Sequence, residues 1–240
     1  MSLTWIALLG LAFAKGPPTT SLMKEKIDLN GDGKADKLEV LSSDGQAGLK
    51  AAKIVVNGVS LSDIQMYKEL AVSIVDVDTS DKLQQILVDG TSESGKKWFT
   101  IFIWDGKKVL QAMKVDTASP NGALKLIDSG QVIVEKPQSF WTERTIWKLS
   151  GYKFDELSQP FFAIGKPAVV ETPIVLVYNP DTTSPVTGVG PGAVVEIVLC
   201  TTGPKPWYLL KTDTGLMGWV DGREIGEAVK PGAKAAPDEG

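Results

Sequence analysis

The sequence consists largely of short apolar segments that are rich in Val, Ile and aromatic residues and are separated by turn residues. Examples are residues 53–58, 97–106 and 131–135. Two segments run into Asn57-Gly58 and Asp105-Gly106, dipeptides that tolerate the positive φ angles of tight hairpin turns. Residues 97–104 are apolar at nearly every position, as in a strand covered on both faces. We therefore expect an all-β fold.

The composition narrows the possible functions of the 240-residue chain. It contains no His, which excludes Ser-His-Asp and Cys-His nucleophiles and His-ligated metal sites. The single Cys200 excludes an intrachain disulfide. Formal charge is −4 and no basic run occurs, so we expect no nucleic-acid partner. These counts favour a protein that is not an enzyme.

The N-terminus resembles an export signal. Residues 3–13 form an apolar run that is too short to span a membrane, and Ala12-Phe13-Ala14 supplies a small-x-small cleavage pattern. We predict a signal peptide at residues 1–14 and a periplasmic or extracellular location. No basic residue precedes the run, so a start codon assigned too late, or a buried N-terminal strand or helix, are the alternatives.

An acidic loop follows, in which oxygen-bearing side chains alternate with other residues and Gly33 permits a sharp bend. Such alternation lets one turn point several oxygens inward, which suits Ca²⁺. The predicted ligands are Asp28, Asn30, Asp32, the Lys34 carbonyl and Asp36. A cation-free turn braced by its own side chains is the alternative.

Two further features bear on this loop. Glu39 completes an EF-hand pattern, so an EF-hand is a further alternative for this loop. The apolar Leu38 and Val40 alternate with polar residues, however, which is typical of a strand and not of the helix that an EF-hand requires. Residues 28–40 also align with residues 76–88, so the acidic turn and its following strand recur. The second copy keeps Asp76 and Asp78 but loses the other acidic positions, which leaves metal binding there open. A third copy near residue 116 is too weak to count.

On these residues, the segment 27–110 resembles the FG-GAP or VCBS-type repeat, an extracellular β unit built around an Asp-x-Asp-x-Asp-Gly-x-x-Asp calcium loop. The resemblance implies that Ca²⁺ stabilises a β-hairpin at the first loop. Two copies do not obviously close a propeller. We therefore expect residues 22–165 to form a partial propeller-like or open antiparallel β domain.

The C-terminal third carries a second pattern, in which Trp207-Tyr-Leu-Leu210 is followed by Gly215-Leu-Met-Gly218-Trp219-Val220. It resembles the ending of bacterial SH3-like domains, which implies a small barrel over residues 168–226 that binds peptidoglycan or an extracellular peptide or glycan. The aromatic candidates for that binding are Tyr178, Trp207, Tyr208 and Trp219. Trp207 and Trp219 are alternatively core residues, and Tyr208 is expected to be the more exposed neighbour. Residues 228–240 are predicted to form a disordered tail.

Between these parts lies an aromatic stretch at residues 140–152, which contains Glu143 and Arg144. It predicts either an edge of the β core or a sugar-binding surface. The resulting hypothesis is an exported, non-catalytic adhesion or binding protein of the cell envelope. A periplasmic assembly factor that docks a protein partner and a glycan hydrolase that uses two carboxylates are the alternatives.

Overall fold

The computed structural model describes residues 19–44, 48–62, 67–180 and 184–232; the predicted signal peptide at 1–14 lies outside these ranges. Within them the chain is nearly all β, with nineteen strands and one short helix. The all-β prediction is therefore confirmed. No helix in the described ranges is long and apolar enough to cross a membrane.

The first twelve strands form three antiparallel sheets, each a meander of four strands consecutive in the chain. Sheet 1 contains β1 (Thr19–Ile27), β2 (Asp36–Asp44), β3 (Lys50–Val56) and β4 (Val59–Ser62). Sheet 2 contains β5 (Glu69–Val75), β6 (Gln85–Thr91), β7 (Lys97–Trp104) and β8 (Val109–Asp116). Sheet 3 contains β9 (Ala123–Leu126), β10 (Gln131–Pro137), β11 (Thr142–Ser150) and β12 (Lys153–Glu156).

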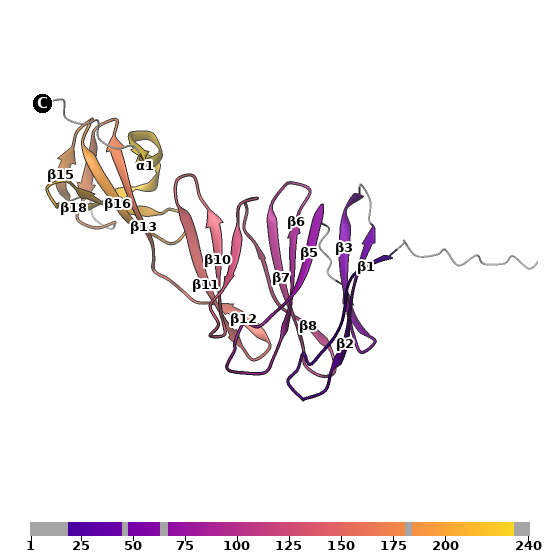
Figure 1. Ribbon diagram of the computed structural model, residues 1–240. Coiled ribbons are helices and arrows are strands. Elements are labelled where there is room, and N and C mark those ends of the chain that lie inside the picture. The colour runs from indigo at the N-terminus through magenta and orange to yellow at the C-terminus, as the bar shows by residue number, and fades with distance from the viewer. Residues whose placement is uncertain (1–18, 45–47, 63–66, 181–183, 233–240) are drawn as a thin grey trace, which may run out of the picture.

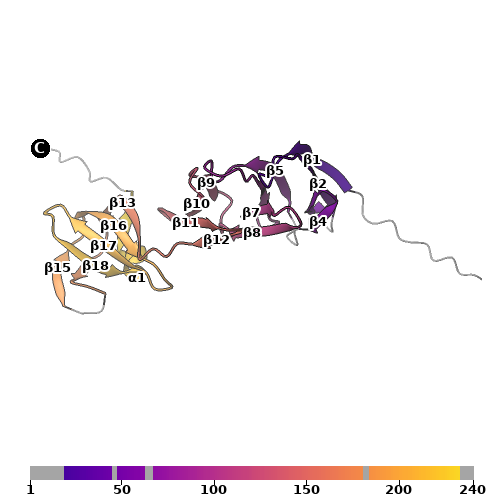
Figure 2. The same ribbon diagram turned by 90° about the horizontal axis from the view of Figure 1, so that it is seen from below.

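The three sheets lie side by side in chain order, with the C-terminal part beyond sheet 3 (Figures 1 and 2). One buried cluster joins sheets 1 and 2, where Leu38 and Ile54 meet Phe102. A second joins sheets 2 and 3, where Ile101 meets Val132. Strand β7 contributes to both clusters, which confirms that residues 97–104 form a strand covered on both faces.

The predicted repeat corresponds to the same connection in successive sheets. Residues 28–35 join β1 to β2, and residues 76–84 join β5 to β6. Backbone hydrogen bonds link each connection to the next sheet: Gln84 donates to the Leu29 carbonyl, and Gly130 donates to the Val77 carbonyl. Gly130 immediately precedes β10, as Gln84 precedes β6. A third equivalent therefore exists, but it is the short connection at residues 127–130 and not the region near residue 116.

The acidic loop is flanked by strands β1 and β2 on its two sides, so the EF-hand alternative, which needs flanking helices, is wrong. Leu38 and Val40 are fully buried, as the alternation predicted. The hairpin turn at Asn57-Gly58 is also as predicted, with both residues at positive φ.

Asp36 is a buried carboxylate at the start of β2, with only 6% of its surface exposed. Its Oδ2 accepts a hydrogen bond from the Leu29 N–H at 3.0 Å. Its Oδ1 accepts one from Asn57 Nδ2 at 2.7 Å and one from Trp104 Nε1 at 3.1 Å. Because Trp104 belongs to sheet 2, this carboxylate ties the loop and the β3–β4 turn of sheet 1 to the neighbouring sheet.

The remaining strands form one seven-stranded antiparallel sheet, here called the C-terminal sheet, in the order β15-β14-β18-β17-β16-β13-β19. The strands are β13 (Phe161–Val170), β14 (Ile174–Val177), β15 (Pro185–Val189), β16 (Val194–Thr201), β17 (Trp207–Thr212), β18 (Met217–Asp221) and β19 (Val229–Pro231). The sheet has its own buried core, which includes Leu176, Ile197 and Leu210.

Helix α1 (Gly222–Ala228) connects β18 to β19, and its N-terminus is capped by Asp221, whose side chain accepts a hydrogen bond from the Arg223 N–H. At Gly218, beside Trp219, the backbone of β18 approaches β14 closely, because a Cβ atom there would lie 2.6 Å from Leu176 Cβ.

Two boundaries in the structure differ from those predicted from the sequence. The C-terminal sheet begins at Phe161, within the segment 22–165 that the sequence assigned to the first domain. The disordered tail predicted at 228–240 starts too early, because β19 pairs with Ala168 to Val170 of β13. Residues 229–231 are ordered because they pair with β13 and because Val229 is buried. The polar composition of the segment gave no sign of either contact.

We predict that Asp36→Ala lowers the free energy of unfolding by about 3 kcal/mol, because three N–H donors around a buried site lose their acceptor. Asp32→Ala, in the same loop but exposed, is the matched control and should cost less than about 1 kcal/mol. Urea denaturation in EDTA measures both. Equal losses for the two variants would show that the Asp36 carboxylate does not brace the sheets.

Candidate functional site

Four of the five predicted calcium ligands lie in the β1–β2 connection, where the side chains of Asp28, Asn30 and Asp32 bond to the loop backbone. Asp28 accepts hydrogen bonds from the N–H groups of Asp32 (3.1 Å) and Gly33 (2.8 Å). Asn30 Oδ1 accepts from the Asp32 N–H, and Asp32 Oδ1 accepts from the Lys34 N–H. Each of these side-chain oxygens keeps lone pairs for a cation, since carboxylate and amide oxygens accept more than one bond.

Asp36 differs from the other predicted ligands. It lies at the base of the loop and is buried, and its carboxylate accepts hydrogen bonds from the three N–H donors described above. Among the described residues, no group of three or more His, Cys, Asp or Glu side chains is gathered closely enough to hold a metal ion. The predicted ligands that remain on the exposed turn are Asp28, Asn30 and Asp32, with the Lys34 carbonyl.

The second acidic loop is braced by its own side chains. Asp76 accepts a hydrogen bond from the Asp78 N–H, and Asp78 accepts from both the N–H and the hydroxyl of Ser80. These bonds from Ser80 lower the pKa of Asp78. Ser80 thus satisfies an oxygen that a cation satisfies in calcium loops.

The four predicted ligand-binding aromatic residues do not form one surface. Tyr178 follows β14 and is 74% exposed, and Trp219 of β18 lies against Phe161 with ring centroids 6.1 Å apart. Trp207 is half-buried. Tyr208 is only 8% exposed, so the prediction that it is the more exposed neighbour of Trp207 is wrong. Residue alternation along β17 turns Tyr208 toward the core and Trp207 outward.

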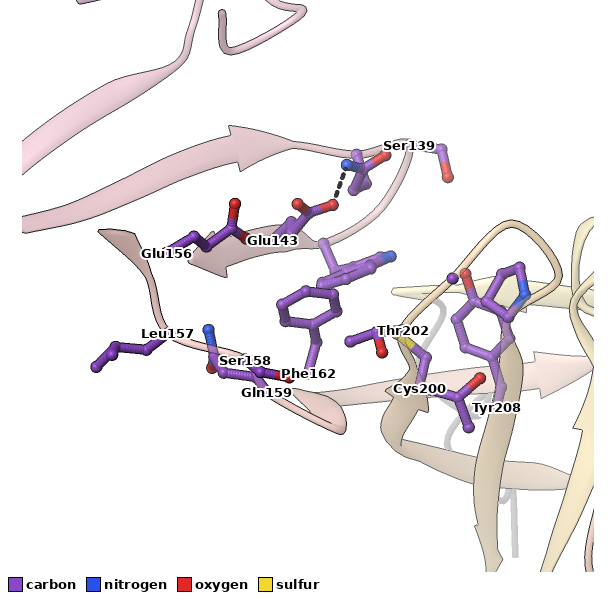
Figure 3. A pocket seen from close by; sticks show the side chains of 15 residues that line it. Ser139, Glu143, Glu156, Leu157, Ser158, Gln159, Phe162, Cys200, Thr202 and Tyr208 are labelled. Carbon is purple, nitrogen blue, oxygen red and sulfur yellow. Dashed lines mark hydrogen bonds between the residues drawn. The ribbon is translucent and has the colours of Figure 1, made fainter. Parts of the chain in front are cut away.

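Tyr208 instead lines a cleft of about 480 Å³ between sheet 3 and the C-terminal sheet (Figure 3). One wall comes from the β10–β11 connection and β11, and another from the segment that joins β12 to β13. The third comes from the end of β16 and the start of β17. The lining side chains with the clearest chemical character are Gln138, Trp141, Glu143, Glu156, Gln159, Phe162, Cys200 and Tyr208.

Aromatic rings from both parts of the chain meet at this cleft. Trp141, from the β10–β11 connection, packs on Phe162 of β13 with ring centroids 5.6 Å apart. Phe140 packs on Tyr208 at 6.1 Å. Both Phe140 and Trp141 are partly buried against the core of the C-terminal sheet. These contacts therefore hold sheet 3 against the C-terminal sheet, and the Trp141–Phe162 pair also supplies an aromatic wall to the cleft.

Polar groups line the rest of the cleft. Glu143 Oε2 accepts a hydrogen bond from Gln138 Nε2 at 3.0 Å, and its Oε1 lies 3.7 Å from Lys136 Nζ. Gln159 Nε2 donates to the Arg144 carbonyl at 3.0 Å. Glu156 ends β12 and is exposed at the cleft. Amides, hydroxyls and carboxylates thus flank an aromatic wall, an arrangement suited to a sugar or peptide.

Two buried ionisable groups lie at the C-terminal side of the cleft. Burial, with a smaller contribution from the negative charge of Glu143, raises the pKa of the Cys200 thiol to about 11. Burial likewise raises the pKa of the Tyr208 hydroxyl. Cys200 is therefore a buried thiol that stays protonated and unreactive at neutral pH.

Sequence reasoning identified part of this cleft. The aromatic stretch at 140–152, for which the sequence predicts either a core edge or a sugar-binding surface, lies partly at this cleft and partly against the core. Trp141 and Glu143 line the cleft, whereas Trp147 packs against the core between sheets 2 and 3. Phe162 and Glu156 were missed, although a strand that begins Phe161-Phe162 must place one ring on each face.

Comparisons with known proteins add little. No protein-family model matches the chain, and no curated protein matches it. Among solved structures, the β-propeller domain of the trilobed protease from Pyrococcus furiosus aligns over 92% of this chain and 96% of its own, at 12% identity. The TM-score of that alignment is 0.27, which is too low to support an argument about fold or function.

We predict that Cys200 reacts with iodoacetamide at pH 8 roughly a hundredfold more slowly than a free cysteine, because only the thiolate reacts and the raised pKa keeps the thiol protonated. The rate should rise with pH toward pH 11. Glu143→Gln removes a nearby negative charge, so it should lower this pKa and speed the reaction. A rate profile with an ordinary midpoint near pH 8.5, unchanged in Glu143→Gln, would contradict the proposed environment.

Proposed function

We propose that this chain is an exported, non-catalytic binding protein of the cell envelope, and that the cleft between sheet 3 and the C-terminal sheet holds its ligand, a peptidoglycan fragment or an extracellular peptide or glycan. The observation that carries the proposal is the 480 Å³ cleft itself, where Trp141, Phe162 and Tyr208 converge. Aromatic faces suit sugar rings and apolar peptide side chains, and the surrounding amides and hydroxyls suit their polar groups.

We also propose that the C-terminal part is an SH3-like barrel. Its strand order supports this: β13 pairs with β16 on one side and with the final strand β19 on the other. The Trp207–Leu210 strand and the Gly218-Trp219-Val220 strand pair as neighbours, as the resemblance implies. The cleft differs from the surface that the sequence predicted, since Trp219 lies outside its lining.

A glycan hydrolase is the second candidate function, because Glu143 and Glu156 line the same cleft. Two carboxylates that flank a sugar are the minimal machinery of glycoside hydrolysis. Release of reducing ends from purified peptidoglycan, lost in Glu143→Gln, would replace the binding proposal with this one. Our proposal predicts no release.

Ca²⁺ is proposed as a structural ion of the first loop, held by Asp28, Asn30, Asp32 and the Lys34 carbonyl. Three observations support it: these residues share one turn, two of them are carboxylates, and the side-chain oxygens keep lone pairs free. The ion would relieve the repulsion between the two carboxylates and stiffen the turn. It takes no part in ligand binding, because the cleft lies in a different part of the chain.

We predict that the full chain sediments with purified peptidoglycan, and that Trp141→Ala lowers retention at least roughly tenfold, since a hot-spot aromatic residue is worth about 1.4 kcal/mol or more. Phe140→Ala is the matched control, because Phe140 packs at the same junction but does not line the cleft. It should retain most binding.

The Trp219→Ala variant separates this cleft from the surface predicted by sequence. Retention by Trp219→Ala and its loss in Trp141→Ala would support the cleft. The opposite pattern would place the ligand on the outer face of the C-terminal sheet, and absence of retention in the unmodified chain would reject peptidoglycan as the ligand.

For the calcium site, we predict that about 2 mM Ca²⁺ raises the thermal midpoint of the protein relative to EDTA, because binding to the folded state alone stabilises it by RT ln(1 + [L]/Kd). Asp32→Ala should lose the shift. Asp81→Ala, an acidic residue of the second loop, should keep it. An identical midpoint in Ca²⁺ and EDTA would leave the first loop as a turn braced by its own hydrogen bonds.

A further inference from the structure

The charged side chains that line the cleft are of one sign. Glu143 and Glu156 are both part of its lining, and no Lys or Arg side chain is, among the residues that the structure describes. An acidic ligand would be repelled by these two carboxylates, and an uncharged ligand could offer them only neutral hydrogen-bond donors, which bond less strongly than charged ones. A cationic ligand would gain a charge-assisted hydrogen bond from each.

Three basic residues near the cleft, Lys136, Arg144 and Lys205, are not part of its lining. Lys136 Nζ lies 3.7 Å from Glu143 Oε1 and offsets part of its charge, but Lys136 does not line the cleft. Arg144 is turned to the other side of β11, where its Nε donates to Glu135 at 2.9 Å. Among the described residues, no side chain or backbone group bonds to the Glu156 carboxylate, which is thus available to a ligand.

The aromatic wall beside the carboxylates restricts the kind of cation that the cleft would prefer. The packed rings of Trp141 and Phe162 line the same cleft as Glu143 and present apolar and π surface to it. An ammonium group on an alkyl stem could pair with a carboxylate while the stem packs on these rings. A hydrated metal ion would use the carboxylates but not the rings.

We infer that the cleft selects ligands that carry a primary ammonium group on an apolar stem, such as a peptide with a free side-chain amine. This inference rests on the proposed binding function and names the ligand chemistry of the same site. Within a cell envelope, it predicts recognition of the peptide part of the wall polymer through an amine that has not been acylated or cross-linked.

The test uses the full chain and the change in its tryptophan fluorescence, checked by calorimetry. The probes are an Ala-Lys-Ala peptide with blocked termini, the same peptide with its side-chain amine acetylated, and glucosamine as an amine on a sugar. We expect the free amine to bind roughly tenfold more tightly than the acetylated form. Glucosamine binding as tightly as the peptide would overturn the preference for an alkyl stem.

Charge-neutral variants identify the groups responsible. Glu156→Gln and Glu143→Gln should each weaken binding of the free-amine peptide several-fold more than binding of the acetylated peptide. Glu93→Gln, which changes an exposed carboxylate in the β6–β7 turn, is the matched control and should change neither affinity. Loss of affinity for both peptides in a cleft variant would indicate a damaged cleft, not charge selection, and would overturn the inference.

Failure of this inference is distinguishable from failure of the proposed function. If the protein is retained on peptidoglycan through Trp141 but acetylation of the wall amines changes nothing, amine selection is overturned and the binding function stands. If the protein neither sediments with peptidoglycan nor binds the lysine peptide, both are overturned. Retention that is lost on acetylation supports both.

Discussion

Face-to-face burial of the three four-stranded sheets is the interaction on which the rest of this structure depends. Sheet 2 is covered on both sides: Phe102 of β7 faces sheet 1, and Ile101 faces sheet 3. None of these meanders could bury its apolar face alone. The backbone hydrogen bonds from Gln84 to Leu29 and from Gly130 to Val77 then fix the offset between neighbouring sheets.

This stacking places the candidate site at the end of the array. Sheet 3 packs on sheet 2 with one face, and the β10–β11 connection extends beyond it to the C-terminal sheet. Phe140 and Trp141 supply that contact by packing on Tyr208 and Phe162. The cleft is thus a consequence of how two separately cored parts of the chain meet, which is a common origin of ligand sites.

Three acidic side chains serve two purposes: one stabilises the fold, and two face the cleft. The buried Asp36 carboxylate accepts hydrogen bonds from three N–H donors in place of water, and it links sheets 1 and 2. Glu143 and Glu156 remain partly solvated at the cleft, where a carboxylate can exchange water for a ligand donor. Cys200 of β16 also lines the cleft, as a protonated thiol, so its contribution there is packing.

The sequence by itself determined the local structure: the strands, the Asn57-Gly58 turn, the inward Leu38 and Val40, and the equivalence of the two acidic loops. These follow from residue alternation and backbone preference, which act between neighbours in the chain. The order of residues 229–231, the structural role of Asp36 and the meeting of Trp141 with Phe162 were decided only by tertiary structure. Each depends on partners far apart in sequence, and no local pattern encodes which faces will pack together.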